Sequence, residues 1–140
     1  MNLRNGDAKI IKNAGAILTQ PFGSAMRSIL IAVYEMGAKE VLVIGHHGCG
    51  MTNLDTKVMV EKFRASGISD TVLSTLENSG IRMDRFLKGI DSSEEGVHHS
   101  VTIIRNHPLM PATVPVQGFI MHSDKGMLEL INEGYSSETV

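Results

Sequence analysis

A histidine and the only cysteine of the 140-residue chain stand three positions apart in a glycine-rich stretch, Gly45-His46-His47-Gly48-Cys49-Gly50. An imidazole nitrogen and a thiolate sulfur at this spacing on a tight turn can both reach one zinc ion, at about 2.0–2.3 Å. The pair alone is a weak signal, because a buried thiol beside a hydrogen-bonded histidine has the same spacing. His47 is open to two interpretations: an exposed turn residue, or a substitute ligand or proton relay. The pair therefore predicts a metal site only if other motifs support it.

Three other chemistries of glycine-rich turns fit less well. A dinucleotide-binding fingerprint needs glycines in the order G-x-G-x-x-G, and here the spacing is reversed. A P-loop needs Gly-Lys-Ser/Thr, which is absent from this stretch. A cysteine phosphatase would place phosphate close to Asp55, whose carboxylate would repel it. A thiol enzyme remains open, with Cys49 as a nucleophile activated by His46 or His47 and with a substrate pocket beside it.

The apolar run Val41–Ile44 precedes this stretch and is expected to position it. Four consecutive branched apolar residues without polar alternation predict a strand buried on both faces, as in a parallel sheet. The capping-box pattern Thr52-Asn53-Leu54-Asp55 predicts that the next helix runs from about Asn53 to Ala65. His46 and Cys49 are therefore expected at the carboxyl end of a central strand, where open α/β sheets place their chemistry.

The rest of the chain alternates between strand and helix signals. The predicted elements are a strand at Ala8–Lys12, a helix from a Ser24 cap to about Met36, short helices at Ser69–Asn78 and Met83–Lys88, a helix capped by Ser92 with Glu95 and ending before Pro108, and strands at Val116–His122 and Met127–Ile131 joined by a hairpin turn with Gly126 in the left-handed position. This order predicts an α/β fold with a mostly parallel sheet, helices on both faces and a C-terminal antiparallel hairpin. Residues 1–140 are predicted to form a single domain.

Composition limits the partners and the compartment. A net charge of −2 gives no reason to expect nucleic acid or an anionic membrane as a partner. One cysteine excludes an internal disulfide and suits a reducing compartment, so a cytoplasmic location is predicted. The sequence shows neither a secretory leader nor an apolar run of about 18 residues, so neither secretion nor membrane spanning is expected.

Several motifs in register resemble the β-class carbonic anhydrases. The segments Gly6-Asp7-Ala8, Ile11-Lys12-Asn13-Ala14-Gly15 and Arg27-Ser28-Ile29 come before the His46–Cys49 stretch in the order of that family's GDA…RNAG and GHxxCG motifs. The spacing holds from Gly6 to Met51, and the C-terminal hairpin also fits, whereas residues 52–112 fit more loosely. Lys12 stands where the family usually has arginine.

The resemblance implies a zinc enzyme that hydrates carbon dioxide to bicarbonate. In this family a zinc ion held by two cysteines and one histidine generates hydroxide near neutral pH, which attacks carbon dioxide. By motif match, His46 and Cys49 are the second and third of these ligands, and Asn13, Gly15 and Gly50 form the rim of the site. The family also implies a homodimer or a higher homo-oligomer with the active site near the interface.

The sequence departs from the family at its beginning. The family's first cysteine lies in a Cys-x-Asp-x-Arg segment a few tens of residues before GDA, and here Gly6 is almost at the start. The chain is therefore predicted to be an amino-terminally truncated member without the family's catalytic aspartate and arginine, so its catalytic residues are left unassigned.

The missing Cys-x-Asp-x-Arg segment is also a central strand of the sheet in the family. Without it, Ala8–Lys12 and Val41–Ile44 must pair directly, leave a gap or take a strand from another chain. The alternative function is a non-catalytic family member that acts through zinc binding or homo-oligomer assembly.

Overall fold

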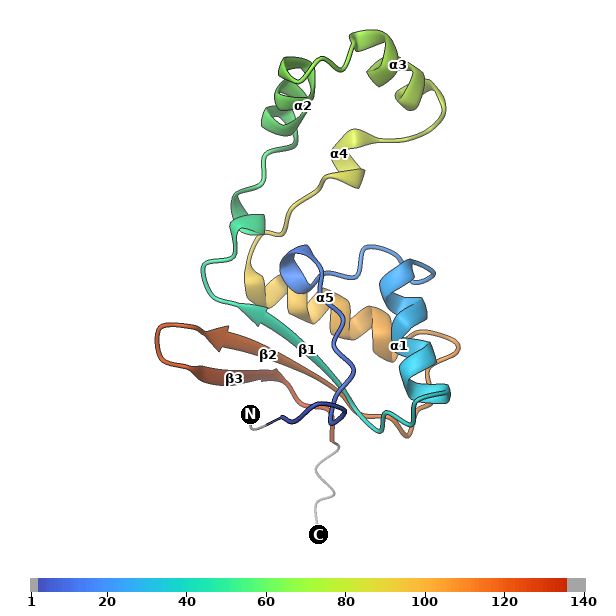
Figure 1. The fold of residues 1–140 in the computed structure, drawn as a ribbon, viewed down its shortest axis with the longest axis vertical. Coiled ribbons are helices and arrows are strands. Elements are labelled where there is room, and N and C mark those ends of the chain that lie inside the picture. The colour runs from blue at the N-terminus through green and yellow to red at the C-terminus, as the bar shows by residue number, and fades with distance from the viewer. Residues whose placement is uncertain (1–2, 136–140) are drawn as a thin grey trace. The chain divides into compact units, whose positions relative to one another are not determined.

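A computed structural model of the chain describes residues 3–135 (Figure 1). Two compact units can be distinguished, one made of residues 3–49 with 92–135 and the other of residues 50–91, and each is described by itself. The single domain expected from the sequence stays a prediction. Among the helices of residues 3–135, none is long and apolar enough to cross a membrane.

The first unit contains a mixed three-stranded sheet of β1 (Val41–His46), β2 (Val116–His122) and β3 (Met127–Asn132), in the order β1-β2-β3. Strands β1 and β2 run parallel, and β2 and β3 form an antiparallel hairpin (Figure 1). Gly126, in the hairpin turn, has φ +62°, the left-handed conformation that the sequence predicts for it. The α/β fold class and the C-terminal hairpin are confirmed.

Helix α5 (Ser93–Arg105) covers one face of the sheet and forms the core with it. The Ser92 hydroxyl accepts a hydrogen bond from the Glu95 backbone N–H at 3.0 Å, which confirms the predicted cap. The apolar stripe of α5 is fully buried against apolar residues from β1, β2, α1 and the segment before α1. The members of this core cluster are Leu18, Met26, Val43, Val97, Val101, Ile104, Val116 and Ile120.

Glycines on neighbouring strands let α5 approach the sheet closely. Gly45 on β1 is paired with Ile120 on β2, and Gly118 lies two residues before Ile120 on the same strand. A Cβ atom at Gly45 would lie 2.8 Å from Val97 Cγ2, and one at Gly118 would lie 2.8 Å from Val97 Cγ1. Both positions therefore need a residue without a side chain if Val97 is to keep its place.

The opposite face of the sheet is only partly covered within the described residues. Leu42 on β1 is 38% exposed and Leu130 on β3 is 46% exposed. The prediction that the run Val41–Ile44 is buried on both faces is therefore wrong. Burial alternates along β1, with Val43 and Gly45 buried beneath α5 and Leu42 on the other side.

A short 3-10 helix, η1 (Ala14–Ala16), precedes α1 (Ser24–Tyr34) and packs against β1 and α5. The buried Ser100 hydroxyl of α5 anchors this segment, because it accepts a hydrogen bond from the Leu18 backbone N–H at 2.9 Å. The cap of α1 is Gly23, one residue earlier than predicted, and Ser24 is already inside the helix. The helix ends at Tyr34 and not at Met36.

The predicted strand at Ala8–Lys12 is wrong, because this segment is irregular coil and its side chains are exposed. A strand needs a neighbour for its backbone groups. The described sheet contains only β1, β2 and β3, and it places β1 at its edge. Ala8–Lys12 therefore does not pair with β1. The prediction that β1 is a central strand is also wrong for the described sheet, where β1 lies at the edge.

The second unit consists of η2 (Gly50–Asn53), α2 (Thr56–Ala65), α3 (Asp70–Asn78) and α4 (Met83–Phe86). The predicted start of α2 at Asn53 is wrong, because residues 50–53 form a separate 3-10 turn. The carboxylate of Asp55 caps α2 by accepting the Lys57 backbone N–H at 2.7 Å. The two later short helices are close to their predicted bounds.

Candidate metal site

The turn that carries His46 and Cys49 follows the carboxyl end of β1, as the sequence predicts. His46 is the last residue of β1, and the next backbone N–H, that of His47, donates to the Met121 carbonyl at 2.9 Å. Gly48 then takes a left-handed conformation with φ +70°, which lets the chain turn sharply. Cys49 follows as a buried residue that is 5% exposed. The two predicted ligands therefore belong to one tight turn.

The imidazole of His46 is oriented by its own turn. Its Nδ1 atom lies 3.1 Å from the His47 carbonyl oxygen. When the ring proton is on Nδ1, this nitrogen donates to the carbonyl and leaves the Nε2 lone pair for a metal ion, an arrangement common among metal-binding histidines. The buried Ser93 hydroxyl, at the start of α5, donates to the His46 carbonyl oxygen at 2.7 Å. Helix α5 thus fixes the end of the strand that presents His46.

The donor types fit zinc, but their number is low. Imidazole nitrogen and thiolate sulfur are both preferred zinc ligands, and a catalytic zinc normally has three protein ligands. Within residues 3–135, no three or more histidine, cysteine, aspartate or glutamate side chains gather in a way that could hold a metal ion. Cys49 is the only cysteine among the 140 residues, so these residues supply one thiolate to the metal and not two.

Two further polar residues lie beside the turn without having been predicted as site residues. The His47 ring stacks on His122, with ring centroids 5.6 Å apart and planes inclined by 24°. His122 Nε2 lies 2.8 Å from a carboxylate oxygen of Glu129 on β3. This group depends on the register of the hairpin, in which Glu129 stands two positions beyond the partner of His122. The signal in the sequence was the alternation of β3, which places Met127 and Glu129 on one face.

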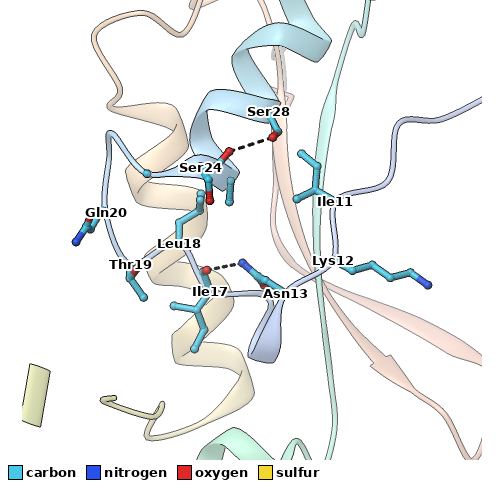
Figure 2. A pocket seen from close by; sticks show the side chains of 11 residues that line it. Ile11, Lys12, Asn13, Ile17, Leu18, Thr19, Gln20, Ser24 and Ser28 are labelled. Atoms are coloured by element: carbon cyan, nitrogen blue, oxygen red, sulfur yellow. Dashed lines mark hydrogen bonds between the residues drawn. The ribbon is translucent and has the colours of Figure 1, made fainter. Parts of the chain in front are cut away.

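The predicted rim residues have clear local roles. The Asn13 amide donates to the Ile17 carbonyl oxygen at 2.7 Å and so closes the η1 turn (Figure 2). Gly15 lies within that turn at φ +78°, which requires a glycine-like backbone. Asn13 also lines a cavity of about 260 Å³ together with Ile11, Lys12 and residues at the start of α1 (Figure 2). Gly50 begins η2, in the second unit. The rim roles of Asn13, Gly15 and Gly50 stay predictions.

Comparison with known proteins gives the family. The sequence profile described as carbonic anhydrase matches residues 1–128. A Bacillus subtilis (strain 168) protein named "Putative carbonic anhydrase YtiB" is 53% identical over 137 residues, which cover 98% of this chain and 73% of that protein. A protein from Acidithiobacillus thiooxidans named "Carbon disulfide hydrolase" is 30% identical over 129 residues, covering 88% of this chain and 63% of that protein.

The fold is similar as well. The crystal structure of β-carbonic anhydrase isoform I from Trichomonas vaginalis superposes with a TM-score of 0.85 and 27% identity, over 95% of this chain and 72% of that one. The match covers nearly the whole of this chain, so it extends well beyond the His46–Cys49 turn. The profile, the relatives and the fold agree with the motifs of the sequence. The chain belongs to the β-class carbonic anhydrase family.

Proposed function

We propose that the protein carrying this chain is a zinc-dependent carbonic anhydrase that catalyses the reversible hydration of carbon dioxide to bicarbonate. His46 and Cys49 are two of its zinc ligands in this proposal. The observation that carries it is the His46–Cys49 turn at the end of β1, in a chain whose family is carbonic anhydrase. The contact between His46 Nδ1 and the His47 carbonyl supports it, because this contact directs Nε2 outward as a ligand.

The residues of the turn have separate tasks in this proposal. His46 presents one nitrogen, with its strand end held by Ser93, and the buried Cys49 presents a thiolate from the other side of the Gly48 turn. Zinc, when bound, supplies Lewis-acid activation of water near neutral pH. Because the sulfur is buried, its metal ligation would be shielded from competing reactions of the thiol.

Carbon dioxide is the proposed substrate. The relative named as a carbonic anhydrase is 53% identical, whereas the relative named as a carbon disulfide hydrolase is 30% identical. We also propose that the protein forms a homodimer or a higher homo-oligomer and that it is located in the cytoplasm. The exposed Leu42 on the edge strand supports association, because apolar side chains at an open sheet edge favour contact with another chain.

The test is a stopped-flow assay of carbon dioxide hydration with a pH indicator, on the purified protein before and after chelation. We expect hydration that is lost with the chelator, restored by added zinc and absent from His46→Ala. His99→Ala removes an exposed histidine of α5 and serves as the control with unchanged activity. Sulfide release from carbon disulfide is measured in parallel and is expected at background level.

Two results would contradict the proposal. If carbon dioxide hydration persisted after chelation and also in His46→Ala, the reaction would not depend on a metal ion bound by His46. If the protein released sulfide but did not hydrate carbon dioxide, its substrate would be carbon disulfide and not carbon dioxide. Zinc binding without either activity would favour the non-catalytic alternative.

A further inference from the structure

A cavity of about 420 Å³ opens beside α1, lined by residues of the loop before the helix, by one face of the helix and by His107. Its lining does not include His46 or Cys49. We propose that this cavity binds a small monocarboxylate with an apolar body, such as a short fatty acid. The proposal rests on the side chains of the cavity and not on the function proposed above.

His107 supplies a buried hydrogen-bond donor without an acceptor. The side chain is 3% exposed, and its Nδ1 accepts the Leu109 backbone N–H at 3.2 Å. Because Nδ1 is the acceptor, the proton of the neutral ring is on Nε2. Within residues 3–135 this Nε2 atom has no hydrogen-bond partner and almost no contact with solvent. Buried donors are normally paired, so the Nε2–H group calls for an acceptor from outside the described chain.

Phe22 contacts the His107 ring without being held firmly. Its ring centroid is 4.9 Å from that of His107, and the ring planes are inclined by 55°. The Phe22 side chain is nevertheless 75% exposed, and it stands between Pro21 and Gly23 in the loop before α1. Little packing therefore opposes a shift of the ring. In the proposed complex the ring moves off His107 and packs against the apolar body of the ligand.

Arg27 supplies the positive charge. Within the described residues its guanidinium makes no ion pair and no side-chain hydrogen bond. Leu30 and Ile31 follow three and four positions later on α1 and therefore share its face of the helix. No acidic side chain lines the cavity. A carboxylate between Arg27 and His107 would accept charge-assisted hydrogen bonds, while an apolar chain would lie along Leu30 and Ile31.

The test is a titration of the intact 140-residue protein with hexanoate, followed by heteronuclear NMR of backbone amides and histidine side chains. We expect saturable shifts at His107, Phe22 and the first turns of α1. Hexan-1-ol, with the same apolar chain and no charge, is expected to bind about tenfold more weakly.

Two variants separate the donor from the charge. His107→Asn keeps an oxygen that can accept the Leu109 N–H and removes the Nε2–H, and Arg27→Gln removes the guanidinium. Each is expected to weaken hexanoate binding by about tenfold. Lys57→Gln removes the same charge from α2, and Cys49→Ser removes a predicted zinc ligand. Both are expected to bind hexanoate as the unmodified protein does, which separates this site from an anion site at the metal.

Three outcomes would overturn the proposal: shifts that do not saturate, hexanoate affinity unchanged in Arg27→Gln, or equal affinities for hexanoate and hexan-1-ol. The last would show an apolar groove without carboxylate recognition. Circular dichroism checks that His107→Asn is folded. If it is not, the comparison of Arg27→Gln with Lys57→Gln decides the matter.

Discussion

Ile104→Ala is expected to lower the free energy of unfolding by about 2–5 kcal/mol, the usual cost of truncating a buried isoleucine to alanine. Ile104 is 0% exposed and belongs to the cluster that joins α5 to the sheet. Truncation removes apolar contacts and leaves a cavity that neighbouring side chains such as Val116 and Val101 can fill only in part. Urea unfolding followed by circular dichroism measures the loss.

The control is Ile103→Ala, one position earlier on the same helix. Ile103 is only partly buried and packs against the edge of the cluster. Its truncation removes the same atoms from a site that solvent already reaches, so the loss should be clearly smaller. Equal losses for the two variants would contradict the orientation of α5 against the sheet.

Gly45→Ala is expected to destabilise the fold by about 1–3 kcal/mol, because it overpacks the contact between β1 and α5. The added Cβ would lie 2.8 Å from Val97 Cγ2 and 3.2 Å from Ile120 Cδ1, so these side chains or the strand must move. Gly45 directly precedes His46, and a displaced strand end would also misplace that ligand. We therefore expect weaker zinc binding together with the lower stability, measured by urea unfolding and metal titration.

The matched control for this change is Gly50→Ala. A Cβ at Gly50 would have no atom within 4 Å, and this glycine is not among those with positive φ. The same methyl group should therefore leave the stability unchanged or raise it slightly, since alanine restricts the unfolded chain. If Gly45→Ala were as stable as Gly50→Ala, the close approach of α5 to β1 would be wrong.

Elements with strong local signals could be predicted from the sequence. The Ser92 cap of α5 and the glycine of the β2–β3 turn depend on residues within a few positions of each other. The run Val41–Ile44 was also found as a strand, because branched apolar residues between turn residues are typical of one. These features needed no knowledge of the neighbouring elements.

Elements that depend on distant partners could not be predicted. Ala8–Lys12 has a strand-like composition, but the described sheet offers it no neighbouring strand. The burial of β1 on one face follows from the position of α5, which the pattern of β1 does not contain. Helix α2 begins at Thr56 because Asp55 caps it, whereas the capping-box pattern predicts a start three residues earlier, at Asn53.

The residues of the candidate site also fall into those that a local motif predicts and those that depend on contacts between distant segments. His46 and Cys49 were found because one short motif holds both residues. The stacking of His47 on His122 and the contact of His122 with Glu129 depend on strand register. The placement of Arg27 and His107 around one cavity depends on packing between α1 and the segment after α5. Apart from the alternation of β3, which places Glu129 on one face of that strand, no spacing in the sequence predicts these contacts.

The most direct test of the central claim is the zinc content of the 140-residue protein, purified without added metal, alongside His46→Ala, Cys49→Ser and His99→Ala. The account predicts about one zinc ion per chain in the unmodified protein and in His99→Ala, and loss of zinc in the other two. Replacement of zinc by cobalt should give a thiolate charge-transfer band that Cys49→Ser lacks. Zinc that persists in both ligand variants would contradict the assignment of His46 and Cys49 as metal ligands. Zinc that is absent from the unmodified protein would contradict the prediction that these two residues hold it without the family's first cysteine.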